Sequence, residues 1–156
     1  MHSRFLPYVQ HLDAKFRSLL AMSPHTPASL PKQMCARGVY LLSEGRRHLY
    51  VGRSNQIRSR LGRHCRPSAT HRMAALAFRL AREETGNLKA TYKKGNGSRA
   101  GLIENRKFLK AFVKAKARIR NMSVRFVEEA DPTRQALLEI YVSIVLRTPY
   151  NDFDTH

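Results

Sequence analysis

The chain has 156 residues, which fits one compact domain with a core large enough to fold independently. Hydrophobic residues make up 42% and charged residues 26%, which argues against wholesale disorder. The 29 Lys and Arg against 11 Asp and Glu give a formal charge of +18, an excess that repels itself unless a polyanion screens it. Nucleic acid is the first candidate partner and an anionic membrane surface the second. No run of about 18 apolar residues occurs, so no transmembrane helix is expected.

The cysteines and the first residues bear on where the protein works. Cys35 and Cys65 form no CxxC pair and no disulfide framework, so a reducing compartment is the simpler assumption. The N-terminal residues lack the uninterrupted apolar stretch of a signal peptide. We therefore expect a cytoplasmic, nucleoid-associated protein. A zinc site of Cys65 with His64 and His71 is disfavoured, because adjacent residues seldom face one ion together.

The start of the chain predicts a helix followed by a linker. Residues 5–21 place apolar side chains at helical spacing. Residues 23–33 contain three prolines and are typical of a connecting segment. Residues 1–35 are therefore expected to form an N-terminal extension to the main domain.

A β-hairpin and a helix are predicted next. Two short apolar runs at 38–42 and 48–52 flank a segment with a glycine available for the turn. Ser54 or Asn55 can cap a helix over 55–66, which ends before a proline.

The middle of the chain predicts two helices around a polar loop. Residues 70–84 have helical spacing, and residues 86–101 are rich in Gly, Lys and Asn. This loop lacks the glycine spacing of a phosphate-binding P-loop. Residues 102–119 predict a helix with one apolar and one basic side. The basic side includes Lys107, Lys110 and Lys114.

The end of the chain predicts a strand and a long helix. Residues 123–127 alternate as a strand does, and Asp131 with Pro132 begins a helix that continues to about 146. Two strands, helices, a late strand and a helix indicate an α+β domain with a small antiparallel sheet.

The charge is unevenly distributed. Residues 46–125 contain 22 Lys and Arg but only three acidic residues. A basic middle with more neutral ends predicts one binding face and not a uniformly solvated surface.

Candidate chemical groups begin in the hairpin. Tyr40 and Tyr50 occupy matching places in its two strands, and a cross-strand aromatic pair is the simpler explanation. Arg60 and His64 are one turn apart in the next helix, where an arginine beside a proton carrier suits phosphoryl chemistry. A basic helix that contacts phosphates without catalysis explains the same pattern.

Glu139 stands out in the last helix. Between positions 136 and 146 only Glu139 and Ser143 are clearly polar. These residues could mark the solvated face of an amphipathic helix. Alternatively, a carboxylate in so basic a protein is a natural ligand for a hard divalent cation.

Together these residues resemble the GIY-YIG nuclease superfamily. Arg60 follows Tyr50 by ten residues, and Asn151 follows Glu139 by twelve, offsets that look like those of the family. The resemblance covers residues 38–66 and about 121–153. Six elements carry it in order: Gly38-Val39-Tyr40, Tyr50-Val51-Gly52, Arg60, His64, Glu139 and Asn151.

The resemblance implies a three-stranded antiparallel sheet flanked by helices and a role for each matched residue. Tyr40 would activate the attacking water, and Tyr50 would line the phosphate pocket. Arg60 would stabilise the charged transition state, and His64 would assist proton transfer. Tyr40 can act as a base only if positive charge lowers its pKa, which is about 10 for a free phenol.

The resemblance also implies the cofactor. Glu139 would bind a single Mg²⁺ or Mn²⁺, which stabilises the leaving oxygen. Asn151 would brace the site without reacting. The expected activity is metal-dependent hydrolysis of phosphodiester bonds in DNA.

The sequence departs from the family pattern in two places. Valine replaces isoleucine in the first triplet, a harmless change for a core aliphatic. A long basic helical insertion at about 66–120 interrupts the expected nuclease domain, residues 36–156, and predicts a built-in DNA clamp. The residues expected to bind nucleic acid are Arg53, Arg58, Arg63, Lys93, Lys94, Lys107, Lys110 and Lys114.

Two alternatives to a nuclease are open. One is a catalytically inactive nucleic-acid-binding protein on the same scaffold, and the other is a basic RNA-associated protein. The second lacks a recognisable aromatic platform or KH-type GxxG. DNA is preferred over RNA on the resemblance alone, and no membrane partner is expected. A restriction-like role would favour a homodimer.

Overall fold

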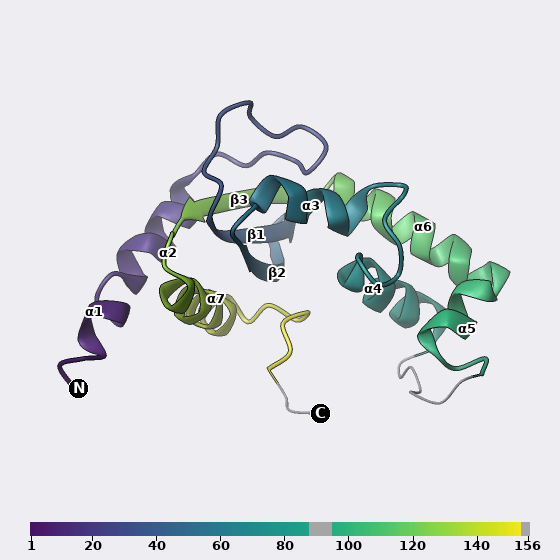
Figure 1. The fold of residues 1–156 in the computed structure, drawn as a ribbon. Helices are drawn as coiled ribbons and strands as arrows, with labels where there is room; N and C mark the ends of the chain where they lie inside the picture. Colours follow the sequence, from purple (N-terminus) through teal and green to yellow (C-terminus); the bar gives the residue numbers. More distant parts are fainter. Residues whose placement is uncertain (88–94, 154–156) are drawn as a thin grey trace. The chain divides into compact units, whose positions relative to one another are not determined.

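The computed structural model describes residues 1–87 and 95–153. Its sheet has three antiparallel strands in the order β2-β1-β3: β1 (Gly38–Glu44), β2 (Arg47–Ser54) and β3 (Ser123–Glu128) (Figure 1). Helices flank the sheet, so the predicted α+β class with a three-stranded antiparallel sheet is confirmed. The central strand β1 pairs Tyr40 with Gly52 on one side and with Phe126 on the other.

One face of the sheet packs on two helices, α2 (Leu12–Ala21) and α7 (Pro132–Leu146). Because side chains alternate along β1, the face that Tyr40 occupies is the opposite one. α7 begins as predicted, since the Asp131 side chain accepts a 2.8 Å hydrogen bond from the amide of Arg134. The buried cluster between sheet and helices contains Leu19, Val39, Leu41, Val51, Leu138 and Val142.

The N-terminal residues belong to the same compact unit as the sheet, which comprises residues 1–60 and 122–156. A single helix over 5–21 is wrong. The chain forms α1 (Leu6–Val9) and α2, because His11, with φ −103° and ψ 0°, leaves the helical conformation between them. The proline-rich segment contacts the edge of β3, where the backbones of His25 and Val124 exchange hydrogen bonds of 3.0 and 2.8 Å.

Residues 61–121 form a second compact unit, and the elements that the structure describes in it are helices. It contains the end of α3 (Ile57–Cys65), followed by α4 (Ala75–Thr85), α5 (Arg99–Glu104) and α6 (Arg106–Arg120) (Figure 1). α4 begins five residues later than the predicted 70–84 helix.

Asn105 divides the helix that was predicted over 102–119, so that prediction is wrong. Its ψ of 123° ends α5, and its side chain caps α6 by accepting a 3.1 Å hydrogen bond from the amide of Phe108. Asparagine favours this position because its side-chain oxygen satisfies an amide that has no partner within the helix. Ser98 caps α5 in the same way, through the amide of Gly101 at 3.0 Å, so the polar loop ends earlier than expected.

The helical unit has its own aromatic core. The ring centroids of Phe78 and Phe108 are 5.1 Å apart. Lys116 is buried on α6, where its ammonium donates hydrogen bonds of 2.7 and 2.9 Å to the carbonyls of Pro67 and Ala69. In the described part of the chain, no helix is long and apolar enough to cross a membrane.

Candidate active site

At the glycine of each triplet another residue lies so close that a side chain would not fit. A Cβ at Gly38, whose φ is +156°, would lie 2.0 Å from the carbonyl oxygen of Val127 on β3. A Cβ at Gly52 would lie 2.3 Å from both Cζ and the hydroxyl oxygen of Tyr40. The phenol end of Tyr40 therefore lies directly over the backbone of Gly52, its cross-strand partner.

Two tyrosines and one arginine meet on this face of the sheet. The rings of Tyr40 and Tyr50 have centroids 6.3 Å apart and an interplanar angle of 53°. Arg60, from α3, is hydrogen-bonded to both phenol groups. Tyr40 is fully buried, whereas Tyr50 and Arg60 are partly exposed. The arrangement brings a permanent positive charge and two hydroxyl groups together at the edge of the core.

The start of α3 fixes Arg60. The amide of Ile57 donates a 2.9 Å hydrogen bond to the carbonyl of Ala36, just before β1, and the hydroxyl of Ser54 accepts one of 2.9 Å from the amide of Gln56. These contacts attach the first turn of α3 to the ends of both hairpin strands. The helix therefore holds the guanidinium in a set position relative to the tyrosines.

Burial governs the ionisation of both phenols. It raises the pKa of Tyr40 far above its ordinary value, and the neighbouring Tyr50 adds to this shift, while the charge of Arg60 only partly opposes it. Burial raises the pKa of Tyr50 as well, although the charge of Arg60 lowers it in part. Both tyrosines are therefore neutral phenols at neutral pH, and the charge of Arg60 alone does not make Tyr40 a base.

Arg60 keeps its charge in this setting. Burial disfavours the guanidinium cation, but the hydroxyls of Tyr40 and Tyr50 outweigh this effect and raise the pKa of Arg60 above its ordinary value. A charged guanidinium is the group that stabilises negative charge on phosphate oxygens.

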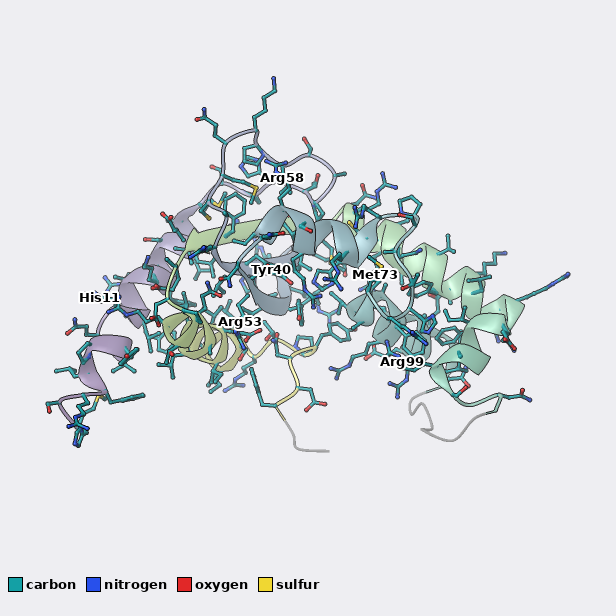
Figure 2. The ribbon with its side chains drawn as sticks, viewed as in Figure 1. His11, Tyr40, Arg53, Arg58, Met73 and Arg99 are labelled. Carbon is teal, nitrogen blue, oxygen red and sulfur yellow. The ribbon has the colours of Figure 1, made fainter. Side chains whose placement is uncertain are left out.

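Glu139 forms an ion pair with Arg53. Nε of Arg53, whose side chain is labelled in Figure 2, lies 3.0 Å from Oε2 of Glu139. The exposed fraction is 19% for the glutamate side chain and 45% for that of the arginine. Burial raises the pKa of Glu139 above its ordinary value, although Arg53 and Arg60 lower it. Glu139 therefore shares the electrostatic field of Arg60 with the two tyrosines.

Asn151 attaches the segment after α7 to β2. Its Oδ1 accepts a 2.8 Å hydrogen bond from the amide of Val51, and its Nδ2 donates one of 2.8 Å to the carbonyl of the same residue. The hydroxyl of Thr148 donates to Oδ1 at 2.7 Å. Val51 lies between Tyr50 and Gly52, so this pairing fixes the backbone that carries both of them.

Replacing Asn151 by Asp is expected to destabilise the fold by about 2 kcal/mol, because the carboxylate cannot donate to the carbonyl of Val51 and faces it at hydrogen-bond distance. Urea unfolding of the purified variant measures this loss. Asn96→Asp makes the same chemical change at an exposed position and should shift stability far less. Equal stability of the two variants would show that the side chain of Asn151 does not hold the C-terminal segment.

The structure brings five of the six motif residues into the unit that contains the sheet; His64 belongs to the helical unit. It lies one turn after Arg60 on α3 and is 1% exposed. The role of His64 in proton transfer stays a prediction from the sequence.

The residues expected to bind nucleic acid occupy different settings. Arg53 is paired with Glu139, and Arg58 donates hydrogen bonds to the carbonyls of Pro31 and Lys32. Lys114 forms a 3.0 Å ion pair with Glu84, whereas three others, Arg63, Lys107 and Lys110, are exposed. Lys93 and Lys94 lie outside the described residues.

Sequence reasoning missed two contributors to this site. Arg53 was assigned to nucleic-acid binding, yet its partner in the structure is Glu139, 86 residues away. Thr148 was not singled out, although its hydroxyl orients Asn151. For Arg53, the only local signal in the sequence is its position directly after the second triplet.

Comparisons of the chain with protein-family models, with curated proteins and with solved structures find no match.

Proposed function

We propose that this protein is a metal-dependent endonuclease of the GIY-YIG type that hydrolyses phosphodiester bonds in DNA. The observation that supports this most is the hydrogen-bonded group of Tyr40, Tyr50 and Arg60, in which the charge of Arg60 also acts on Glu139. A scaffold that only binds nucleic acid has no evident need for a buried and a partly exposed phenol around an arginine and a half-buried carboxylate.

The donor set of Glu139 fits one hard divalent cation. Mg²⁺ is commonly held by one or two carboxylates, with water and substrate phosphate completing its shell. Glu139 supplies one such carboxylate, and no group of three or more His, Cys, Asp or Glu side chains that could enclose a metal occurs in the part of the chain that the structure describes. Bound there, Mg²⁺ or Mn²⁺ would stabilise charge on the phosphate and acidify a bound water.

The protein residues then have separable roles. Arg60 binds the scissile phosphate and stabilises the negative charge that grows on its oxygens. Tyr50, as a neutral and partly exposed phenol, orients the attacking water or a phosphate oxygen through a hydrogen bond, and the fully buried phenol of Tyr40 positions Arg60. Close packing of the Tyr40 ring on the backbone of Gly52 fixes this orientation.

Cleavage of supercoiled plasmid by the purified wild-type protein tests the proposal, with Mg²⁺, Mn²⁺ or EDTA and with a Glu139→Gln protein purified in parallel. Metal-dependent nicking or cutting by the wild type alone is expected. Discrete fragments would indicate restriction-like specificity, and random nicking a repair or structure-dependent role. Binding without cutting of plasmid, branched DNA or RNA under every metal condition would favour the inactive binder.

Arg53 is expected to compete with the cation for Glu139. In Arg53→Gln the carboxylate loses an exposed ion pair of about 0.4–1 kcal/mol, so Mn²⁺ should bind about two- to fivefold more tightly at neutral pH. Arg53 also lowers the pKa of Glu139, so its removal raises that pKa further. Mn²⁺ binding by the variant should therefore decline at a higher pH than in the wild type as the solution is acidified.

Titration of Mn²⁺ followed by electron paramagnetic resonance, at neutral and at mildly acidic pH, measures both effects without DNA or turnover. Arg58→Gln, which removes an arginine from a separate contact, is the matched control. Weaker binding of Mn²⁺ to Arg53→Gln at neutral pH would show that Arg53 supports the cation site and does not compete with it.

A further inference from the structure

The helix α7 exposes apolar side chains to water. Between positions 134 and 146 its exposed residues are Ile140, Ile144 and Val145, whereas its polar residues Gln135 and Ser143 are buried. A surface helix normally has the opposite arrangement, with polar residues outside and an apolar stripe against the core. A helix that is apolar on its outer side as well is typical of one that is covered on all sides.

The aliphatic residues on the outside of α7 follow helical spacing. Leu137, Ile140 and Ile144 are three and four residues apart, so they form one line along the helix. Leu137 is half-buried, and the exposed fractions of Ile140 and Ile144 are 39% and 67%. We call these three residues the outer stripe. Within residues 1–87 and 95–153, no segment covers it.

The short helix α1 extends this apolar surface beside α7 (Figure 1). The guanidinium carbon of Arg134 on α7 lies 5.9 Å from the centroid of the Tyr8 ring on α1. Phe5, which precedes α1, and Leu6 and Tyr8 within it are exposed. The exposed residues of α1 and the outer stripe therefore adjoin one another, and we call them together the α1–α7 face.

The α1–α7 face is large enough for a specific protein contact. The exposed fractions of six large apolar residues there lie between 37% and 67%: Phe5, Leu6, Tyr8, Ile140, Ile144 and Val145. At roughly 200 Å² for each whole residue, they present on the order of 600 Å² of apolar surface. Specific protein interfaces bury about 600–1,000 Å² on each partner, so these residues alone reach the lower end of that range.

The charge of the surrounding chain favours a second copy as the partner. The whole chain has a formal charge of +18, yet residues 1–22 and 128–153 contain five Lys and Arg against six Asp and Glu. Two copies that approach through basic surfaces repel each other, whereas this part of the chain is close to neutral. The open apolar face thus coincides with a region where a second copy meets little repulsion.

Other partners fit the α1–α7 face less well. Helices that lie on anionic membranes carry Lys and Arg beside their apolar residues. The exposed residues of α7 between positions 134 and 146 include neither. An acidic protein would be attracted to the basic residues within 46–125 and not to a neutral face. In a symmetric dimer, by contrast, the same patch contacts itself about a two-fold axis, which suits an apolar stripe on a helix.

We propose that the α1–α7 face is the contact surface of a symmetric homodimer, with the outer stripes of two copies packed against each other. Glu139 follows Leu137 by two residues, so it lies on the opposite side of α7. The ion pair of Glu139 with Arg53 therefore stays outside the contact in each copy. The dimer requires neither DNA nor metal, so it does not rest on the proposed function and is tested separately from it.

Sedimentation equilibrium of nucleic-acid-free protein in EDTA, at about 1–100 μM, measures the dimer directly. The variant is Ile140→Glu with Ile144→Glu, which places four carboxylates in the contact and should weaken the dimer by at least about 10²-fold. The matched control is Leu109→Glu with Val113→Glu on α6, where the two residues are one turn apart and 42% and 55% exposed. This control should change the dissociation constant by less than about threefold.

A second variant separates the contact from folding. Ile140→Ala with Ile144→Ala adds no charge and keeps α7 helical, since alanine has the highest helix propensity. It should weaken the dimer by at least about tenfold, because each substitution acts twice in a symmetric contact. This variant gives the answer if the glutamate variant loses its native circular dichroism spectrum.

Salt and lipid distinguish the dimer from other kinds of association. Raising the salt from about 100 to 500 mM should tighten the dimer, because it screens the repulsion between two basic chains. Dissociation at high salt would instead indicate copies bridged by a polyanion and would overturn the proposal. A wild-type monomer at about 100 μM, or equal weakening by the α7 and α6 glutamate variants, would overturn it as well. Monomeric protein that floats with phosphatidylserine vesicles, and no longer does so after Ile140→Ala with Ile144→Ala, would assign the face to a lipid surface.

Discussion

Replacing Glu139 by Gln is expected to abolish plasmid cleavage while DNA binding persists. A cation at a phosphodiester supplies several kcal/mol of transition-state stabilisation, so loss of its protein ligand should slow cutting by at least about 10³-fold. Glutamine keeps the shape of the side chain. The ion pair that is lost involves a half-exposed arginine, so its loss should cost at most about 1 kcal/mol of stability. The fold should therefore survive the substitution.

DNA affinity adds a second expectation for Glu139→Gln. The substitution removes a negative charge and releases Arg53, so binding in EDTA should be as tight as in the wild type or tighter. Glu104→Gln removes the same charge from an exposed position in the helical unit and should cut DNA normally. Cleavage by Glu139→Gln at the wild-type rate would eliminate Glu139 as the metal ligand and require another source of catalysis.

Local patterns in the sequence are sufficient to predict most of the sheet and α7. The β1–β2 hairpin follows from two apolar runs around a turn, and Asp131 with Pro132 specifies the start of α7. The breaks at His11 and Asn105 were missed, because each depends on one residue within a spacing that a continuous helix also satisfies. At Asn105 the side chain caps the next helix through a hydrogen bond, and this interrupts the helix although the apolar spacing continues on both sides.

The contacts that organise the candidate site join residues far apart in the sequence. Arg53 meets Glu139 across 86 positions, and Asn151 meets Val51 across 100. Such pairs carry no periodic signal in a single sequence. The resemblance ordered the residues, but it could not show that Arg53 holds the carboxylate or that burial keeps Tyr40 neutral, since both depend on packing.

Gly52→Ala is expected to reduce cleavage by about 10²-fold and to destabilise the fold by about 1–3 kcal/mol. The added methyl group would lie 2.3 Å from Cζ and the hydroxyl of Tyr40, and this ring is fully buried, so either the ring or β2 must shift. A displacement of about 1 Å at a reacting group is enough for a rate loss of this size. Urea unfolding and the initial rate of plasmid cleavage measure the two effects separately.

Gly45→Ala is the matched control, because no atom lies within 4 Å of the added methyl group at that turn. Its φ of +55° should cost about 1 kcal/mol in backbone strain and leave cleavage unchanged. Adding Tyr40→Leu to Gly52→Ala removes the clashing atoms, so the double variant should be more stable than the sum of the single effects predicts, yet still fail to cut. Full activity of Gly52→Ala would mean that the packing of Tyr40 on Gly52 supports the fold and has no part in the reaction.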